Sequence, residues 1–535
     1  MKLFLKINPV IGFVIIWLLL LLILPWRGFF LLNDSYVYEW NVRHFFENGF
    51  LLHPLTSPTT LFQTFLGSLV YIVKKDPSYL RLMTSIFYLL GVIYFYKTLI
   101  LNKIRKRLSF LLSLLLMLNP LYLNLGFSFM TDIYFLSLFI ISSYYYLLFL
   151  QNRATKSLVI TSLVVTFSVL SRQTGIFISI AFILIYLYIK KRKKSIRHIL
   201  ILLIPVIVFI LYQLFYPKPL AYTYQSISVT QGKLFLLGFY LEVLFRIIKT
   251  FYYFGFFVFP VTLGYVLYLV VKNKFFKAPS LLIFSSVFFV FTVFSIFFWI
   301  FQNELMFYVP NILSYAGFNP QNLGFGIKQT LFVDSPVRVR ALITLISIAS
   351  LGGLAIILHN SKIDIYKNKL FYILGVPSIS ILVISFVFRD YFDRYIIVVL
   401  PLILFILGNY LNKIRPKYYF YVPFLIVMFI VSVTFEHDYL SLNKYVWNLS
   451  QTISANQLDV KSTFEHNAYY RLSNIYTGKP PQYIFSKEWL PKNEDYKYIV
   501  SYTNVEPYCT IDKYYYPSFI SPGFKGKLQL LKKCQ

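Results

Sequence analysis

The sequence predicts an all-α polytopic membrane protein of about thirteen transmembrane helices, with a small soluble α/β domain at its C-terminal end. The first observation is composition: 58% of the 535 residues are hydrophobic and only 13% are charged, whereas soluble domains carry about 25% charged residues. The second is that apolar residues form long uncharged stretches, and about 20 such residues in a helix cross the ~30 Å hydrocarbon core of a bilayer. The third is that basic residues fill the short loops between these stretches.

The expected spans follow in order from these stretches, because a helix that satisfies its own backbone hydrogen bonds is tolerated in lipid. They lie near residues 9–26, 79–101, 108–126, 132–150, 156–171, 175–190, 198–216, 251–271, 280–300, 340–358, 370–388, 395–412 and 417–435. The basic loops join alternate spans, and the only acid among them is Asp364. The positive-inside bias therefore places the N-terminus in the cytoplasm. Since the span count is odd, residues 436–535 are expected outside.

The net charge of +31 follows from this loop bias, so it argues against a nucleic-acid partner. The long segments all fall on the outer side, which indicates that the working surface faces outward. They are residues 27–78, 217–250 and 301–339. The apolar stretch Pro58–Val73 is too short to cross, because as a helix it reaches only ~24 Å. We expect it to lie in the membrane–water interface within the first outside loop, where Lys74 and Lys75 extend to water.

Two domains are expected, a transmembrane domain of residues 1–435 and an extracytoplasmic domain of residues 436–535. Short apolar stretches such as Tyr496–Tyr502, separated by glycine- and proline-containing turns, predict a small mixed α/β unit for the second. Cys509 and Cys534 are the only cysteines of the chain. An extracytoplasmic compartment permits a disulfide, and the sequence leaves their pairing open.

Asp34 stands at the start of a short helix expected in the first outside loop. It shares a face of that helix with Tyr38, four residues later, while Glu39 and Arg43 share another. In the structural interpretation, Asn33 or Asp34 caps the helix and the second pair is a surface ion pair. In the functional interpretation, the Asp34 carboxylate takes part in chemistry. The spacing alone favours the structural interpretation.

Asp132 falls in the first turn of the fourth span, just beyond the second outside loop. Ser128 or Thr131 could cap that helix, and the positive helix end favours an ionised carboxylate there. An acidic group at the edge of the hydrocarbon is nevertheless a functional candidate.

Arginines gather at the same face, which the positive-inside bias does not populate. Arg81 opens the second span, Arg172 lies between the fifth and sixth, and Arg394-Tyr395 ends the polar run Arg389–Tyr395. These side chains either extend to lipid headgroups or grip a phosphate with their planar forks. Because a carboxylate can deprotonate a hydroxyl while arginines stabilise a leaving phosphate, group transfer is a possible chemistry here.

The order and placement of these residues resemble the GT-C glycosyltransferases of the protein O-mannosyltransferase and aminoarabinose (ArnT-like) transferase type. That family carries Asp-Glu-x-x-Tyr in its first outside loop, matched here by Asp34 to Tyr38 with Ser35 in place of the glutamate. The other matches are Gly49–Pro54 with His53, Arg81, Asp132, and Arg394-Tyr395 followed by Pro401. The resemblance covers nearly the whole chain, and the Ser35 departure removes the second acid of the motif.

The resemblance implies an inverting glycosyltransferase that moves a hexosyl or pentosyl unit from a polyprenyl-phosphate donor to a hydroxyl acceptor at the outer face of a prokaryotic plasma membrane. Asp34 would be the general base, and Asp132 would position the acceptor or support the base. Arg81 and Arg172 would hold the lipid phosphate. The further substrate contacts would be Tyr38, His53, Arg394 and Tyr395. The implied partners are this donor, a protein, lipid or glycan acceptor, and membrane lipid.

No metal-ligand spacing occurs in the sequence, and no cofactor follows from it. The resemblance leaves metal dependence open, because some members of the family use a divalent ion. A cell-envelope oligosaccharide polymerase or ligase is an alternative function, but it would depend on arginines in a large late loop. A lipid or solute transporter is another, although transporters typically show internal repeats and ionisable groups near the midplane. A non-enzymatic scaffold would not need acids at these helix starts.

Overall fold

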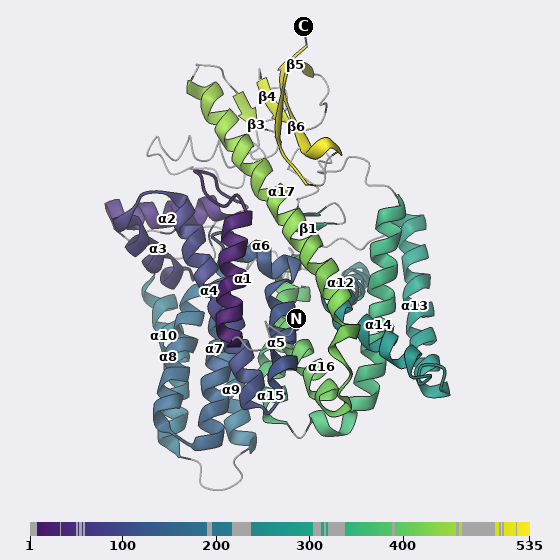
Figure 1. Cartoon of the computed structure of the whole chain (residues 1–535). Coiled ribbons are helices and arrows are strands. Elements are labelled where there is room, and N and C mark those ends of the chain that lie inside the picture. The colour runs from purple at the N-terminus through teal and green to yellow at the C-terminus, as the bar shows by residue number, and fades with distance from the viewer. Residues whose placement is uncertain are drawn as a thin grey trace.

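The computed structural model describes residues 8–32, 34–49, 52, 56, 59–189, 195–216, 237–302, 312–314, 317–318, 337–366, 368–387, 391–455, 460–462, 498–501, 504, 508–519 and 522–534. Within these ranges, long helices form a bundle and a β-sheet stands beyond one of its ends (Figure 1). The bundle helices are α1 (Pro9–Ile23), α4 (Pro77–Leu101), α5 (Lys106–Met117), α6 (Pro120–Gly126), α7 (Thr131–Asn152), α8 (Thr155–Ser171), α9 (Ile176–Ile189), α10 (Ile196–Phe215), α12 (Leu237–Val271), α13 (Ala278–Gln302), α14 (Val337–Ile365), α15 (Lys369–Val387), α16 (Leu400–Ile414) and α17 (Val422–Ala455).

Shorter elements connect and cover the bundle. The first outside loop contains α2 (Ser35–Asn48) and α3 (Leu61–Val73), which pack together at the end of the bundle nearest the sheet (Figure 1). Single 3-10 turns are η1 (Gln173–Gly175), η3 (Asp393–Val399), η4 (Tyr418–Phe420) and η7 (Pro522–Phe524). The strands are β1 (Leu313–Ser314), β2 (Gly317–Phe318), β3 (Val460–Ser462), β4 (Tyr498–Ser501), β5 (Tyr508–Pro517) and β6 (Lys525–Lys533).

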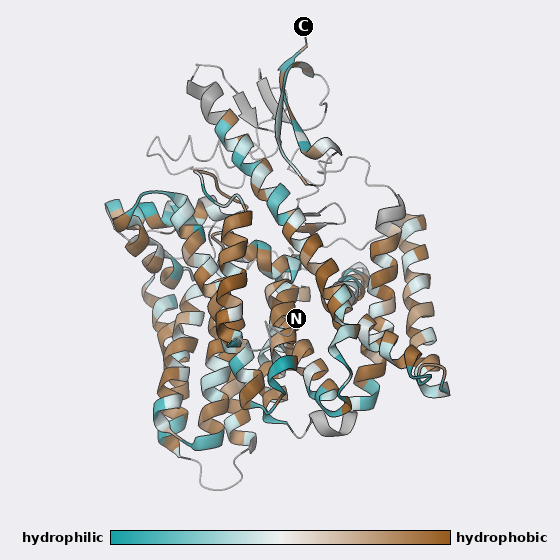
Figure 2. Ribbon diagram, in the orientation of Figure 1, coloured by the Kyte–Doolittle hydropathy of each residue, from teal (hydrophilic) through white to brown (hydrophobic). Residues whose placement is uncertain are grey.

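The bundle has the lengths and composition of an integral membrane protein. Nine helices of the described residues are long and apolar enough to cross a membrane, and ten if the bent pair α5–α6 is one span. Hydrophobic residues run along the bundle helices, while hydrophilic residues gather at the helix ends (Figure 2). Each of the thirteen expected spans coincides with a helix or helix pair, so the predicted helical membrane fold is confirmed. The orientation across the membrane stays a prediction.

Three bundle helices begin at an Asx-Pro dipeptide. The side chains of Asn8, Asp76 and Asn119 each accept a backbone N–H from the first turn that follows. Proline is tolerated at the first helical position, because the N–H that it lacks would have no helical partner there. This local signal fixes the starts of α1, α4 and α6.

The third expected span is broken. Its two parts, α5 and α6, meet at an angle of 65°, because Asn119 and Pro120 start a new helix inside the apolar stretch. Helix α17 holds the break: Ser432 Oγ donates to the Leu118 carbonyl at 2.8 Å, and the buried Glu436 carboxylate accepts from Asn124 at 2.9 Å. The sequence analysis treated residues 108–126 as one span, since hydropathy carries no information about a bend.

Helix α3 matches the apolar stretch expected in the interface. A Cβ added at Gly67 would lie 2.5 Å from the Val42 side chain, so this glycine lets α3 pack closely on α2. The expected pair Arg43–Glu39 forms at 2.6 Å, and Tyr71 of α3 donates to the same carboxylate at 3.2 Å. Glu39 is therefore a buried link between the two helices and not part of a surface pair.

The C-terminal strands form a four-stranded sheet in the order β3-β4-β6-β5, in which only the β3–β4 pair is parallel. Cys509 and Cys534 form a disulfide with a Cα–Cα distance of 5.3 Å, which answers the question that the sequence left open. Helix α17 runs unbroken past the expected domain boundary at residues 435 and 436 and reaches the sheet (Figure 1).

The sheet is anchored to α17 through Asp438. This buried carboxylate accepts the hydroxyl of Ser518 and, at 2.7 Å, the backbone N–H of Phe519, just after β5. The Phe519 ring also contacts the His437 ring, with 4.2 Å between the centroids. The end of β5 is thereby fixed to the helix that leaves the bundle.

Asp438→Ala is expected to increase amide hydrogen exchange in β5, because Ser518 and Phe519 lose their shared acceptor. Exchange in the bundle helices should stay unchanged. Asp512→Ala is the matched control, since Asp512 is an exposed residue of the same strand. Equal exchange in the two variants would contradict an anchoring role for Asp438.

Candidate functional site

Asp34 lies at the N-cap position of α2, but its carboxylate makes no capping hydrogen bond. It accepts instead from Arg394 of η3, with 3.0 Å between Oδ2 and Nη1. The Asp34 side chain is 42% exposed and that of Arg394 only 9%. A carboxylate that keeps one side open to a ligand while a buried cation holds the other suits a reactive group better than a cap.

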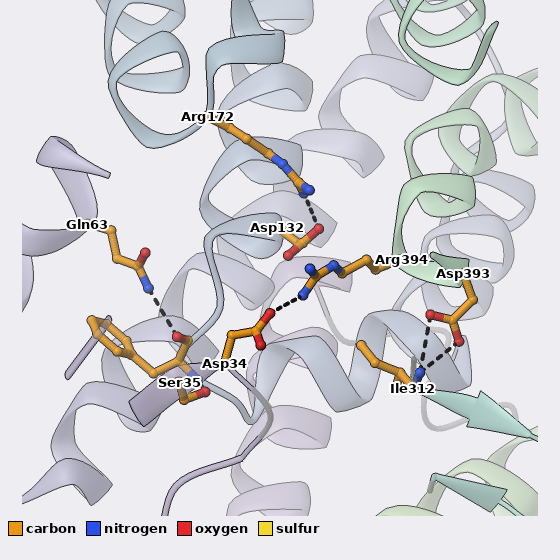
Figure 3. A network of polar contacts seen from close by, with 9 residues as sticks. Asp34, Ser35, Gln63, Asp132, Arg172, Ile312, Asp393 and Arg394 are labelled. Carbon is orange, nitrogen blue, oxygen red and sulfur yellow. Dashed lines mark hydrogen bonds and ion pairs between the residues drawn. The ribbon is translucent and has the colours of Figure 1, made fainter. Parts of the chain in front are cut away.

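Asp132 occupies the first turn of α7 and forms an ion pair with Arg172, which stands between α8 and η1 (Figure 3). The expected cap at Ser128 or Thr131 is not formed: the N-cap residue is Met130, and no side chain caps this helix among the described residues. Ser128 turns back to the carbonyl of Leu125. Asp132 is therefore held by a cation from another helix pair and not by its own helix start alone.

Two tyrosines join these ion pairs into one cluster. The Arg172 guanidinium lies 5.0 Å from the Tyr395 ring centroid, and that of Arg394 lies 5.8 Å from the same ring. Tyr38 is buried, and burial followed by the nearby Asp34 carboxylate raises its pKa to about 12. We define the candidate cluster as Asp34, Asp132, Arg172, Arg394, Tyr38 and Tyr395.

Asp393 belongs to the same region, although the sequence analysis gave it no role. Its buried carboxylate accepts the backbone N–H of Ile312 at 3.1 Å (Figure 3). It also accepts the backbone N–H of Leu313 at 2.6 Å. The Leu313 carbonyl in turn accepts from Tyr253 of α12 at 3.2 Å. A carboxylate inside the polar run before a late span was the available signal. Through these hydrogen bonds, Asp393 links the start of β1 to η3, the element that also carries Arg394.

Arg81 is not brought to the candidate cluster. It is 1% exposed, and its guanidinium donates to the carbonyls of Trp26 and Gly28, the latter at 2.6 Å, and of Phe30. The guanidinium also lies 4.0 Å above the Phe30 ring. Arg81 therefore folds the chain after α1 onto α4, and we leave it out of the phosphate-binding set expected from the sequence.

His53, the remaining predicted site residue, lies outside the described residues. Among those that are described, no group of three or more His, Cys, Asp or Glu side chains could hold a metal ion. The two carboxylates of the cluster, Asp34 and Asp132, are each paired with an arginine.

Comparison with known families supports the expected class. Residues 58–216 match the family described as Dolichyl-phosphate-mannose-protein mannosyltransferase. The match confirms the resemblance to the protein O-mannosyltransferase type over this segment, which contains Asp132 and Arg172, and it supports glycosyltransferase activity. A search of curated protein sequences found no match.

Solved structures give weaker similarities. ArnT from Cupriavidus metallidurans bound to undecaprenyl phosphate shares 13% identity at a TM-score of 0.42, covering 88% of this chain and 75% of ArnT. The same protein in the apo state shares 11% identity at a TM-score of 0.39, covering 98% of each chain. The archaeal oligosaccharyltransferase AglB from Archaeoglobus fulgidus, in complex with an inhibitory peptide and a dolichol-phosphate, shares 13% identity at a TM-score of 0.36, covering 80% of this chain and 56% of AglB.

Arg81→Lys is expected to lower the free energy of unfolding by about 1–3 kcal/mol. The single ammonium nitrogen of lysine cannot span the three carbonyls that the guanidinium nitrogens of Arg81 bind, so buried acceptors are left unsatisfied. The measurement is a thermal melt of the detergent-purified protein. Arg27→Lys is the matched control, since Arg27 is an exposed residue of the segment after α1 that Arg81 binds. A melt of Arg81→Lys that overlays the wild-type melt would contradict the structural role.

Proposed function

We propose that this chain is an inverting glycosyltransferase that moves a sugar from a polyprenyl-phosphate donor to a hydroxyl acceptor. The observation that carries the proposal is the pairing of Asp34 with Arg394 beside the pairing of Asp132 with Arg172. Two carboxylates and two guanidinium groups then stand at one end of an apolar bundle. The family match over residues 58–216 supports the same class.

The charges of the candidate cluster suit a phosphate-linked donor. The two ion pairs sum to zero, so a phosphodiester that carries one negative charge meets no net repulsion. When the sugar leaves, the polyprenyl phosphate gains a second negative charge, and guanidinium groups can stabilise this charge as it develops. Among the described residues, the buried Nε of Arg394 has no hydrogen-bond partner. Arg394 therefore retains a donor for a ligand oxygen.

Asp34 is the proposed general base. Its exposed carboxylate oxygen would accept the proton of the acceptor hydroxyl while the acceptor oxygen bonds to the anomeric carbon. The bond from this carbon to the phosphate oxygen breaks at the opposite face, which inverts the configuration. Asp132, being 3% exposed and paired with Arg172, is better placed to orient Arg172 and the substrate than to take a proton.

Tyr38 does not compete with Asp34 as the base. Because burial and the Asp34 carboxylate raise its pKa to about 12, its hydroxyl stays protonated near neutral pH. It can therefore donate a hydrogen bond to a substrate oxygen but cannot remove a proton.

The outer-face reaction, the sugar and the acceptor class belong to this proposal, and a protein, lipid or glycan hydroxyl would satisfy the same chemistry.

Asp34→Asn is expected to lower turnover by roughly two orders of magnitude or more, because an amide cannot accept the proton. The measurement is transfer of labelled sugar in membranes, from a panel of polyprenyl-phosphate monosaccharides that begins with the mannosyl donor. Expression should be retained because the Asp34 carboxylate caps no helix. Some thermal stability should be lost, since the buried Arg394 guanidinium keeps only a neutral amide as its partner, and turnover is therefore compared per folded protein.

Asp76→Asn is the matched control for this change. Asp76 caps α4 by accepting from Ser78 at 2.8 Å, and asparagine caps a helix as well as aspartate does. This variant should transfer sugar normally. Full transfer by Asp34→Asn would remove the catalytic assignment.

Arg172→Lys and Arg394→Lys are expected to weaken binding of undecaprenyl phosphate, because lysine lacks the bidentate fork. The measurement is binding of this lipid to the purified protein. Arg105→Lys is the control, since Arg105 bonds Asn412 and the Leu411 carbonyl, at the side expected to face the cytoplasm. Unchanged binding in both cluster variants would exclude the phosphate assignment.

A further inference from the structure

We propose that Ser35 and Gln63 are positioning residues that set the location of Asp132 relative to Asp34. They do so by binding the backbone of Phe129 on both sides of its Cα atom: Ser35 binds the N–H and Gln63 binds the carbonyl. The inference rests on the proposed function, because it gives these residues a role in aligning the two carboxylates.

The contacts converge on the backbone of one residue, Phe129, and Figure 3 shows the two side chains that make them, Ser35 and Gln63. The Ser35 hydroxyl accepts the Phe129 N–H at 3.1 Å, and the Gln63 amide donates to the Phe129 carbonyl at 3.2 Å. Ser35 and Gln63 are each 1% exposed, and Phe129 is fully buried. Water cannot replace either partner at such depth, so both bonds fix the backbone.

The Phe129 backbone lies in the short segment that leads into α7 and Asp132. Phe129 precedes Asp132 by three residues, and Met130 between them is extended with φ −110° and ψ 148°. No side chain caps α7 among the described residues. The loop therefore takes its position from the Phe129 contacts and from the ion pair that Asp132 makes with Arg172.

Each contact starts from an element that also defines the first carboxylate. Ser35 directly follows Asp34 and is the first residue of α2. Gln63 lies on α3, which packs on α2 through Gly67 and Val42. The hydroxyl of Ser35 thus joins the backbone beside one carboxylate to the backbone that leads to the other.

The residue type at position 35 fits this role. A glutamate there would place a third negative charge in a buried position beside Asp34 and near Asp132, where like charges destabilise each other. A serine hydroxyl accepts the Phe129 N–H without adding charge. In this chain, the position after the proposed base therefore contacts protein backbone.

The test is a double-mutant cycle with Asp132→Asn. Ser35→Ala should lower the turnover number roughly 10- to 100-fold, as expected when reacting groups shift by about 1 Å. The KM for the polyprenyl-phosphate sugar should change little, because the arginines come from other elements. In the Asp132→Asn background the further loss from Ser35→Ala should be much smaller, since residues that act through one another are not additive.

Gln63→Met removes the other contact at similar size and should behave like Ser35→Ala. It also keeps the inference testable if Ser35→Ala fails to fold. Ser68→Ala is the matched control, because Ser68 is a buried serine of α3 whose hydroxyl donates to Thr64 of its own helix at 2.8 Å. Amide exchange at residues 127–131 should rise in both test variants and not in the control.

Three results would contradict the inference in distinguishable ways. Wild-type protein that transfers no sugar from any donor would overturn the proposed function together with this inference. Active wild type with normal turnover in Ser35→Ala and Gln63→Met would overturn the inference alone. Losses that multiply fully with that of Asp132→Asn would show that Ser35 acts independently of Asp132, which also overturns it.

Discussion

The pairing of Arg394 with Asp34 and of Arg172 with Asp132 is the interaction on which the site depends. Taking charges out of water costs several kcal/mol for each ion, and a partner in good geometry must offset this cost. Arg394 and Asp34 are 360 residues apart in the chain. The bundle must therefore bring the starts of α2 and α7 to the turn after α8 and to η3.

The surrounding structure serves this convergence. Arg81 gathers three carbonyls of the segment between α1 and α2 onto α4, which fixes the chain shortly before Asp34. Asp393 fixes the backbone at Ile312 beside Arg394. The side chains of Arg81 and Asp393 are both buried, and both form hydrogen bonds with the protein backbone. They support the backbone around the site, while the Asp34 carboxylate itself stays partly exposed.

The helices could largely be predicted from hydropathy, because a bilayer requires apolar helices of defined length. Loop charge predicts only their orientation, because basic residues favour the cytoplasmic side. The break between α5 and α6 could not be predicted, since Asn119 and Pro120 bend the chain without changing its hydropathy. The continuation of α17 past residue 435 was also missed, because polar residues such as Glu436 and Asp438 lowered the apolar signal while tertiary partners kept the helix intact.

The candidate cluster could be predicted in part. Residue type and placement at one face selected four residues that the structure brings together: Asp34, Asp132, Arg172 and Arg394. Which cation pairs with which carboxylate depends on tertiary packing and has no local signature. Arg81 shows the limit of such reasoning: its position suggested phosphate, but three nearby carbonyls form a site that only the folded chain reveals.

The most direct test of the ion-pair site is an experimental structure of the protein with undecaprenyl phosphate bound. Our account predicts that the phosphate lies within hydrogen-bond distance of Arg172 and Arg394, with the Asp34 carboxylate open toward the position of the anomeric carbon. A phosphate bound elsewhere, with both ion pairs unchanged and closed to the lipid, would contradict it.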